Sequence, residues 1–192
     1  MTDDTSLLRG LASDLDGSFE QLVRTYQDRL YGFALRLTGS RQDAEEAAQD
    51  TLVRAYRALE RYPAERRREL RLRPWLHQIA LNVVRNRARR SVLPTVAVDG
   101  AVANGLAARG AEQPESMALR SERWSDLVAA LSDLPNRYRA AVVLRHVQGL
   151  SYAESAEVLE QPIGTTKSDV HRGLRLLRER LEADLLVEAR NS

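Results

Sequence analysis

The chain has 192 residues, of which 43% are hydrophobic, 29% charged and 5% aromatic. It contains only ten glycines and six prolines, fewer turn residues than a β-sandwich or barrel of this length needs, so the composition favours an all-α protein. The absence of cysteine excludes disulfides, thiolate zinc sites and cysteine nucleophiles. No stretch approaches the ~20 continuous apolar residues of a membrane span, and the acidic start MTDDTS is unlike a signal peptide, so we expect a cytoplasmic protein.

Charge is distributed unevenly along the chain. Residues 1–60 hold 7 Arg against 11 acidic residues, a net charge of −4, whereas residues 61–90 hold 10 Arg against 2 Glu, a net charge of +8. A second basic block lies at residues 163–180, which contain five basic and two acidic residues. Basic blocks are often only solvated faces, but two separated blocks suggest a polyanion bound at two places.

The N-terminal half is predicted to be a helical domain. Residues 1–17 are expected to form a flexible tail that is either loose or weakly helical. From Phe19 apolar residues recur every three or four positions, which predicts a helix that ends at Gly39. A second helix begins near Ser40 with acidic residues in its first turns, and a third runs from about Pro74 to Arg90. We predict that residues 18–91 fold together.

The C-terminal half is predicted to be a separate helical domain. Residues 92–120 are rich in Ala, Gly and Val without sustained periodicity, and this length is too great for a routine connection inside one domain. The helical pattern resumes at about Ser121, breaks at Leu134-Pro135 and continues through residues 121–192. The expected architecture is two small helical domains joined by a flexible linker.

A helix-turn-helix is indicated by SYAESAEVLEQPIGTTKSDVHRGL at residues 151–174. Ser151 and Glu154 have the spacing of a capping box, and Pro162 is tolerated in the first turn of the next helix. That second helix carries polar and basic residues near its N-terminus, where a recognition helix meets base edges in the major groove. An ordinary αα-hairpin would show the same pattern.

The segment LPNRYRAAVVLRHVQGLSYAESAEVLEQPIGTTKSDVHRGLRLLRERL (134–181) resembles the domain of sigma-70-family initiation factors that reads the promoter −35 element. The nearest class is the two-domain extracytoplasmic-function type, group IV. The other half matches independently: FEQLVRTYQDRLYGFALRLTGSRQDAEEAAQDTLVRAYRAL, followed by LRPWLHQIALNVVRNRARR, is similar to the family's domain for polymerase binding and −10 melting. The resemblance implies a sigma factor without enzymatic activity or cofactor. Its implied partners are promoter DNA, the beta-prime and beta subunits of core RNA polymerase, and an anti-sigma factor.

The resemblance also implies three groups of binding residues. The expected core polymerase contacts are Asp43, Glu46, Gln49, Asp50, Arg54 and Arg57. The expected −10 DNA contacts are Arg61, Arg66, Arg67, Arg71, Asn82, Arg85, Asn86 and Arg89. The expected −35 DNA contacts are Thr165, Thr166, Lys167, Ser168, Asp169, His171, Arg172 and Arg175.

Asp169 is the main departure from the family pattern, which commonly has Arg there; the family also has Ala at Gly173 and Val at Thr166. A carboxylate facing DNA phosphates is repelled. Asp169 therefore either accepts a hydrogen bond from cytosine N4 or pairs with Arg172 three residues later on the same helix. On either interpretation it influences the −35 sequence that is read.

Other functions fit the residues less well. Trp75 lies in an apolar stripe, which favours core packing over base stacking, and His77 has no second ligand at metal spacing and is expected on the surface or in packing. We find no glycine-rich phosphate loop, metal-ligand cluster or nucleophile–base pair in the sequence. The remaining alternatives are a stand-alone helix-turn-helix repressor or activator, and a helical adaptor without a DNA role.

Overall fold

The computed structural model describes residues 4–91 and 127–191, and the regular secondary structure in these ranges is entirely helical, as the composition predicts. The helices are α1 (Asp4–Ser13), α2 (Leu15–Thr38), α3 (Arg41–Arg61), α4 (Ala64–Arg68), α5 (Leu72–Ser91), α7 (Asn136–Val142), the π-helical η1 (Val143–Val147), α8 (Tyr152–Leu159) and α9 (Ile163–Asn191). Residues 127–133 are also helical. Within the described part of the chain, no helix is long and apolar enough to cross a membrane. The predicted linker at 92–120 lies outside the described residues.

Residues 4–17, predicted to be a loose or weakly helical tail, are mostly helical and pack against the rest of the N-terminal half. Residues Asp4–Ser13 form α1, in which Leu7 and Leu11 are 1% and 0% exposed. The Tyr26 hydroxyl donates a 2.6 Å hydrogen bond to Asp4 Oδ1 and ties this helix to α2. Two leucines one turn apart form an apolar face that α2 and α4 cover, and burying that face stabilises a helix too short to persist alone.

The α2–α3 hairpin forms where the sequence predicts it. Gly39 adopts the left-handed conformation (φ 71°) that ends α2, and its N–H donates to the carbonyl of Leu35 at 2.8 Å. Ser40 then caps α3, its hydroxyl accepting from the N–H of Asp43 at 3.3 Å. The small buried residues Ala44 and Ala47 allow α3 to approach α2 closely.

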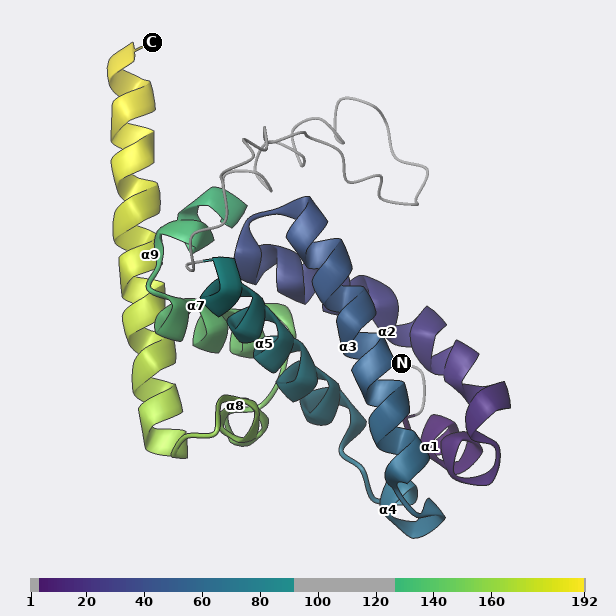
Figure 1. Cartoon of the computed structure of the whole chain (residues 1–192). Helices are drawn as coiled ribbons and strands as arrows, with labels where there is room; N and C mark the ends of the chain where they lie inside the picture. The colour runs from purple at the N-terminus through teal and green to yellow at the C-terminus, as the bar shows by residue number, and fades with distance from the viewer. Residues whose placement is uncertain (1–3, 92–126, 192) are drawn as a thin grey trace.

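In the C-terminal half, α7 and α8 pack against the first half of α9, and η1 contacts α7 and α8 (Figure 1). In η1 the backbone N–H of Gln148 bonds to the carbonyl of Val143 five residues earlier. This wider turn shifts the side-chain register. Leu144 is fully buried, whereas the apolar side chain of Val147 is 37% exposed.

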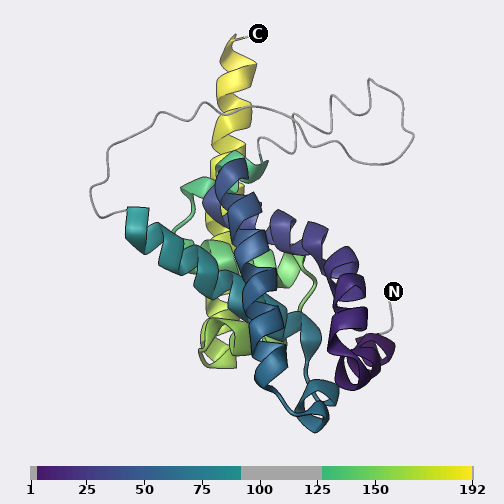
Figure 2. The same ribbon diagram turned by 45° about the vertical axis from the view of Figure 1, so that its right-hand side comes forward.

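The two halves are docked against each other rather than held apart. A single hydrophobic cluster contains buried residues of both, and α5 lies alongside α8 (Figure 2). Gln148 is central to this contact: its carbonyl accepts from Arg73 Nη2 at 2.6 Å, and its side-chain oxygen lies 3.1 Å from His77 Nε2. His77 is therefore a packing residue, 1% exposed, at the junction between the halves.

Candidate nucleic-acid interface

The helix-turn-helix has the local geometry that its sequence predicts. The Ser151 hydroxyl accepts from the N–H of Glu154 at 3.2 Å, and the Glu154 carboxylate accepts from the N–H of Ser151 at 2.8 Å. This confirms the capping box at the start of α8. Glu160 ends α8 in the left-handed conformation (φ 55°), and α9 begins three residues later at Ile163.

The first turns of α9 present a polar and basic surface. The expected −35 residues that are exposed are Lys167, Ser168, His171, Arg172 and Arg175. Thr165 is half-buried. Three cationic residues on the exposed side of one helix form a surface that attracts phosphate.

Two expected −35 residues lie inside the protein instead. Thr166 and Asp169 are both 0% exposed, so neither side chain can reach DNA from this position. Asp169 Oδ2 accepts from Arg137 Nε at 2.8 Å and from Gln161 Nε2 at 3.1 Å. The expected contacts with DNA or with Arg172 are therefore corrected: the carboxylate pairs with α7 and the inter-helix turn.

Helical spacing explains this correction. Counting back from the core-facing Leu177 in steps of three or four reaches Gly173, Asp169 and Thr166. These positions share the face of α9 that packs on α7, whereas Arg172 lies on the exposed side. The periodicity contained this signal, but Arg137 could not be identified as the partner because it is 32 residues away in the chain.

A second polar surface lies along α5. Asn82, Arg85 and Arg89 are exposed, and Asn86 is half-buried. Arg89 Nη2 donates to Asn86 Oδ1 at 2.8 Å, which orients that amide. The spacings of three and four residues place these side chains along one side of the helix, as the sequence predicts.

The arginines before α5 are placed differently from one another. Arg61 is exposed, and Arg66 is exposed with its guanidinium 4.0 Å from the ring centroid of Tyr62. Arg67 is half-buried, because it donates to the backbone carbonyls of Leu59 and Leu11 at 2.8 and 3.1 Å. Its place in the fold is to join α4 to α3 and α1.

Arg71 pairs with the other half of the chain. Its Nη1 lies 2.6 Å from Glu157 Oε2, and its Nη2 lies 3.4 Å from Glu154 Oε1. Both partners belong to α8. An expected −10 contact is thus occupied by carboxylates of the helix-turn-helix in this arrangement.

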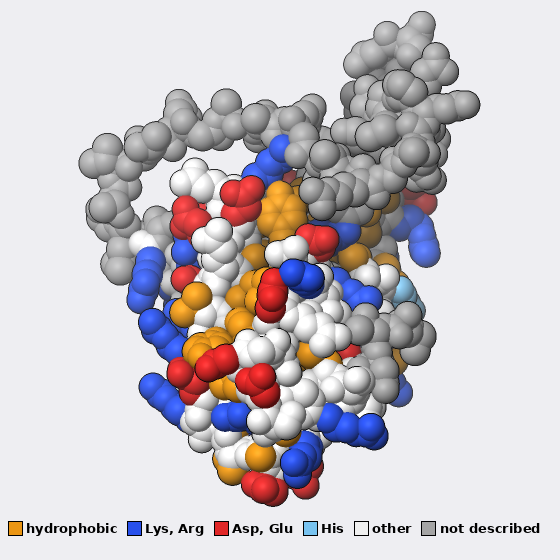
Figure 3. Space-filling view, turned by 90° about the vertical axis from the view of Figure 1, so that its right-hand side faces the viewer, with side chains coloured by type: hydrophobic (Ala, Val, Ile, Leu, Met, Phe, Trp, Pro, Cys, Tyr) orange, Lys and Arg blue, Asp and Glu red, His pale blue; other side chains and the backbone are white. Residues whose placement is uncertain are grey.

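The expected polymerase-binding residues form a row on α3. Asp43, Gln49, Arg54 and Arg57 are exposed, and Glu46 and Asp50 are half-buried. Figure 3 looks onto the side of the molecule that carries α1 and α2, where acidic and basic side chains lie interspersed around smaller hydrophobic areas. The α3 row itself also combines acidic and basic side chains, and a surface of mixed charge favours oriented encounter with a partner.

Arg87, which the sequence interpretation does not single out, lies against the acidic end of this row. Its guanidinium bonds to the Glu46 carboxylate and lies 3.9 Å from Asp43 Oδ1 and 3.7 Å from Asp50 Oδ2. A hydrogen bond from Arg87, and to a smaller extent one from Gln42, hold the pKa of Glu46 below its usual value. The acidic stripe at spacings of three and four predicts a cation opposite, but only the tertiary contact of α3 with α5 identifies it.

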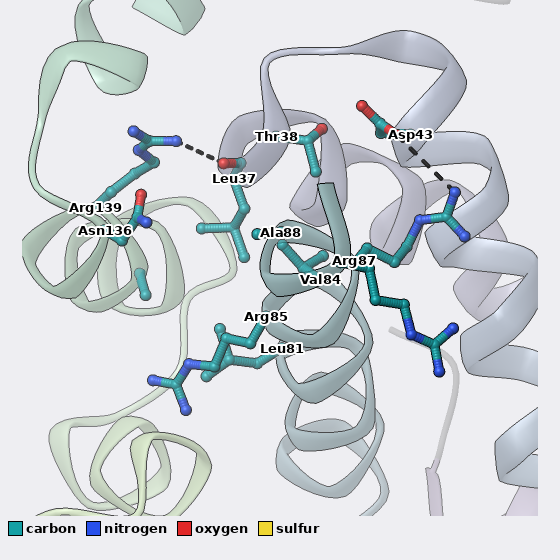
Figure 4. Close-up of a pocket in the computed structure, with 12 residues that line it drawn as sticks. Leu37, Thr38, Asp43, Leu81, Val84, Arg85, Arg87, Ala88, Asn136 and Arg139 are labelled. Atoms are coloured by element: carbon teal, nitrogen blue, oxygen red, sulfur yellow. Dashed lines mark hydrogen bonds and ion pairs between the residues drawn. The ribbon is translucent and has the colours of Figure 1, made fainter. Parts of the chain in front are cut away.

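A cleft of about 500 Å³ lies between the two halves. Its walls come from the end of α2, from α3, from α5 and from α7, and they include Arg85, Arg87 and Arg139 (Figure 4). Arg139 is 8% exposed and donates to the carbonyls of Leu37 and Leu134 at 2.5 and 3.0 Å. Burial lowers the pKa of Arg139, and its bond to Leu37 joins α7 to α2.

Comparison with known proteins places both halves in one family. The model of Sigma-70 region 2 matches residues 22–92, and the model of Sigma-70 region 4 matches residues 125–177. The chain is 32% identical over 178 residues to the RNA polymerase sigma-H factor of Pseudomonas aeruginosa, covering 90% of each protein. It is 30% identical over 172 residues to the ECF RNA polymerase sigma factor SigW of Bacillus subtilis, covering 85% of this chain and 89% of SigW. Over 170 residues it is 36% identical to the ECF sigma factor SigE of Mycolicibacterium smegmatis, a match that spans 85% of this chain but 62% of that longer protein.

Two solved structures share the fold. CnrH, in complex with the cytosolic domain of CnrY, superposes with a TM-score of 0.68 at 24% identity, covering 94% of this chain and 98% of CnrH. The sigma factor RpoE of Bartonella quintana, in complex with the anti-sigma factor NepR, superposes with a TM-score of 0.66 at 26% identity, covering 86% of this chain and 98% of RpoE. Because both family regions match in order and the relatives align along most of the chain, this protein belongs to the ECF group of the sigma-70 family of RNA polymerase sigma factors.

Proposed function

We propose that this sigma factor directs initiation through three separate surfaces, one for core RNA polymerase and two for promoter DNA. The observation that carries this division is the exposed basic side of α9 directly after the short turn that follows α8, with Lys167, Arg172 and Arg175 facing solvent. The N-terminal turns of such a helix fit the major groove, where Arg bonds bidentately to guanine and to phosphate. We assign this surface to the −35 element.

The polar side of α5 is assigned to the −10 element. Melting takes bases out of the stack, which costs a few kcal/mol, and an extruded base must be held by hydrogen bonds to its edge. Asn82 and Asn86 offer both donors and acceptors for this purpose. Arg85 and Arg89 lie along the same side and can follow the phosphates of the displaced strand.

The row on α3 is assigned to core polymerase. Arg87 partly neutralises its acidic end, while Arg54 and Arg57 add positive charge at the other. A partner surface with the opposite alternation of charge would bind it in one orientation. We further infer that the chain makes and breaks no bonds itself, that the polymerase supplies catalysis, and that the protein acts in the cytoplasm.

The docked arrangement of the halves must open for this function. The −10 and −35 elements are about 25 base pairs apart, or about 85 Å at 3.4 Å per base pair. A compact chain of this length has a radius of gyration of about 16 Å, so it cannot reach both elements at once. CnrH and RpoE are each solved with a protein partner, RpoE with an anti-sigma factor, and we infer that an anti-sigma factor also binds this chain and keeps its DNA-reading surfaces from the promoter.

Three substitutions test the division. Arg89→Ala and Arg172→Ala are expected to weaken promoter complexes by about tenfold or more while binding to core polymerase stays unchanged. Asp50→Arg is expected to impair assembly with core, and Glu45→Arg, an exposed charge reversal on the same helix, serves as its control. Core binding is measured by pull-down, and promoter use by run-off transcription.

Two outcomes would contradict the proposal. Loss of core binding in Arg172→Ala would contradict the separation of surfaces, and normal assembly of Asp50→Arg would contradict the α3 assignment. Tight, sequence-specific DNA binding by the chain without polymerase would favour a stand-alone repressor or activator instead.

A further inference from the structure

Asp169 lies where α7, the α8–α9 turn and the recognition helix α9 meet. Its Oδ2 accepts from Arg137 of α7 at 2.8 Å and from Gln161 of the turn at 3.1 Å. The same amide nitrogen of Gln161 lies 3.1 Å from Thr166 Oγ1. An amide has two N–H donors, so Gln161 can bond to both oxygens at once and hold the turn against α9.

A close approach between α7 and α9 lies one helical turn further on, at Gly173. A Cβ atom at this position would lie 2.6 Å from Val142 Cγ2 and 3.2 Å from the Tyr138 carbonyl oxygen, which leaves no room for a side chain. Asp169 and Gly173 are four residues apart and therefore share one face of α9. Asp169 and Gly173 thus lie together against α7. Gly173 allows the two helices to approach closely, and the hydrogen bond from Arg137 to Asp169 joins α7 to α9.

The Asp169 carboxylate is costly to bury without a cation. Its side chain is 0% exposed, and within the described residues its Oδ1 has no hydrogen-bond partner. A buried carboxylate requires pairing, and Arg137 is the cation that supplies it. The negative charge is therefore compensated and turned away from the surface that faces DNA.

Arg137 is held by Asp169 but is not enclosed. The bond is made through Nε, and 56% of the Arg137 side chain remains exposed. The guanidinium lies at the start of α7, beside the first turns of α9 that carry the exposed Lys167 and Arg172. An arginine fixed at Nε presents its terminal nitrogens in the planar geometry that matches a phosphate.

We propose that Arg137 is a DNA-backbone contact of the −35 interface and that Asp169 is the positioning residue that holds it there. The proposal rests on the function proposed above, in which α9 enters the major groove. In a helix-turn-helix, elements beside the recognition helix cross the phosphate backbone and set register without reading sequence. Asp169 acts on promoter binding through Arg137 and the pose of α9, with no contact to a base.

The test measures promoter binding by the holoenzyme across a salt series, with Arg137→Gln, Asp169→Ala and the double variant. Glutamine retains a donor for Asp169 but carries no charge. Loss of one phosphate contact reduces the slope of log affinity against log salt by about 0.9. The ratio of wild-type to Arg137→Gln promoter affinity is therefore expected to be about eightfold larger at 0.1 M salt than at 1 M salt. The same loss is expected on every −35 sequence. Arg178→Gln, an exposed arginine further along α9, is the matched control and is expected to keep the wild-type slope.

Additivity tests the positioning role. Asp169→Ala is expected to weaken the promoter complex, and combining it with Arg137→Gln is expected to add nothing, since both act through one contact. Core binding and the unfolding midpoint are measured for each variant, and Asp169→Asn replaces Asp169→Ala if the latter does not assemble with core. An unchanged salt slope in Arg137→Gln overturns the phosphate contact, and additive losses overturn the positioning role. A wild-type holoenzyme that shows no promoter-specific binding would instead refute the proposed function.

Discussion

The contact between Arg71 and α8 provides a direct test of whether the docked halves compete with promoter binding. Arg71 Nη1 lies 2.6 Å from Glu157 Oε2, and their side chains are 54% and 47% exposed. An ion pair this exposed contributes up to about 1 kcal/mol. Glu157→Gln should therefore shift the ratio of open to docked chains by at most about fivefold. Glu157→Arg replaces the attraction with a repulsion of similar size and should shift the ratio by roughly the square of that factor.

The shift can be measured in the free protein by single-molecule energy transfer. The chain has no cysteine, so cysteines introduced at the exposed positions Glu60 and Arg178 are labelled uniquely. We expect the low-transfer population to grow in the order wild type, Glu157→Gln, Glu157→Arg, and to grow in wild type as salt screens the pair. Glu182→Arg, a charge reversal on α9, is the control.

Promoter binding should follow the same order. If the docked form predominates, the apparent affinity for promoter and core equals the affinity of the open form multiplied by the fraction of chains that are open. Variants that increase this fraction should therefore bind more tightly. Identical transfer distributions in wild type and Glu157→Arg, with both proteins folded, would contradict this prediction. The contact would then not contribute to holding the halves together.

Three further predictions concern stability. Gly173→Ala should lower the free energy of unfolding by about 1–3 kcal/mol in chemical denaturation, since its Cβ would lie 2.6 Å from Val142 Cγ2. Gly164→Ala is the control and should be neutral or stabilising, because an added Cβ there has no atom within 4 Å. Equal effects of the two substitutions would contradict the close approach. Ser151→Ala removes the hydroxyl that caps α8 and should cost about 1 kcal/mol, and an unchanged denaturation midpoint would show that the cap does not matter. Burial lowers the pKa of His77 in the folded protein, so as the pH falls the unfolded chain binds this proton at a higher pH than the folded chain does. Stability should therefore fall as the pH drops through about 6.5. The His77→Leu variant should lose that part of the pH dependence of the thermal midpoint.

Much of the fold is readable locally. Gly39 marks the C-terminal end of α2, and the capping box at Ser151 marks the start of α8. Each signal satisfies backbone groups within four residues of itself. The first helix shows the limit of such reasoning. Its leucines at positions 7, 8 and 11 hold the right spacing, but the segment is short and acidic at its start, and its stability comes from packing on α2 and α4.

Local sequence signals predict the all-α class, the order of the two sigma regions, and the side of α9 that carries its basic residues. These properties depend on periodicity and on signals that act within a few residues. Which charges meet depends on how the helices pack: Arg87 contacts the α3 row, Arg71 contacts Glu157, and Arg137 contacts Asp169. Partners 32 to 86 residues apart are brought together only by helix packing, so no local pattern could assign them. For the same reason, the carboxylate of Asp169, which the sequence predicts to face DNA, is a buried ion-pair partner in the folded protein.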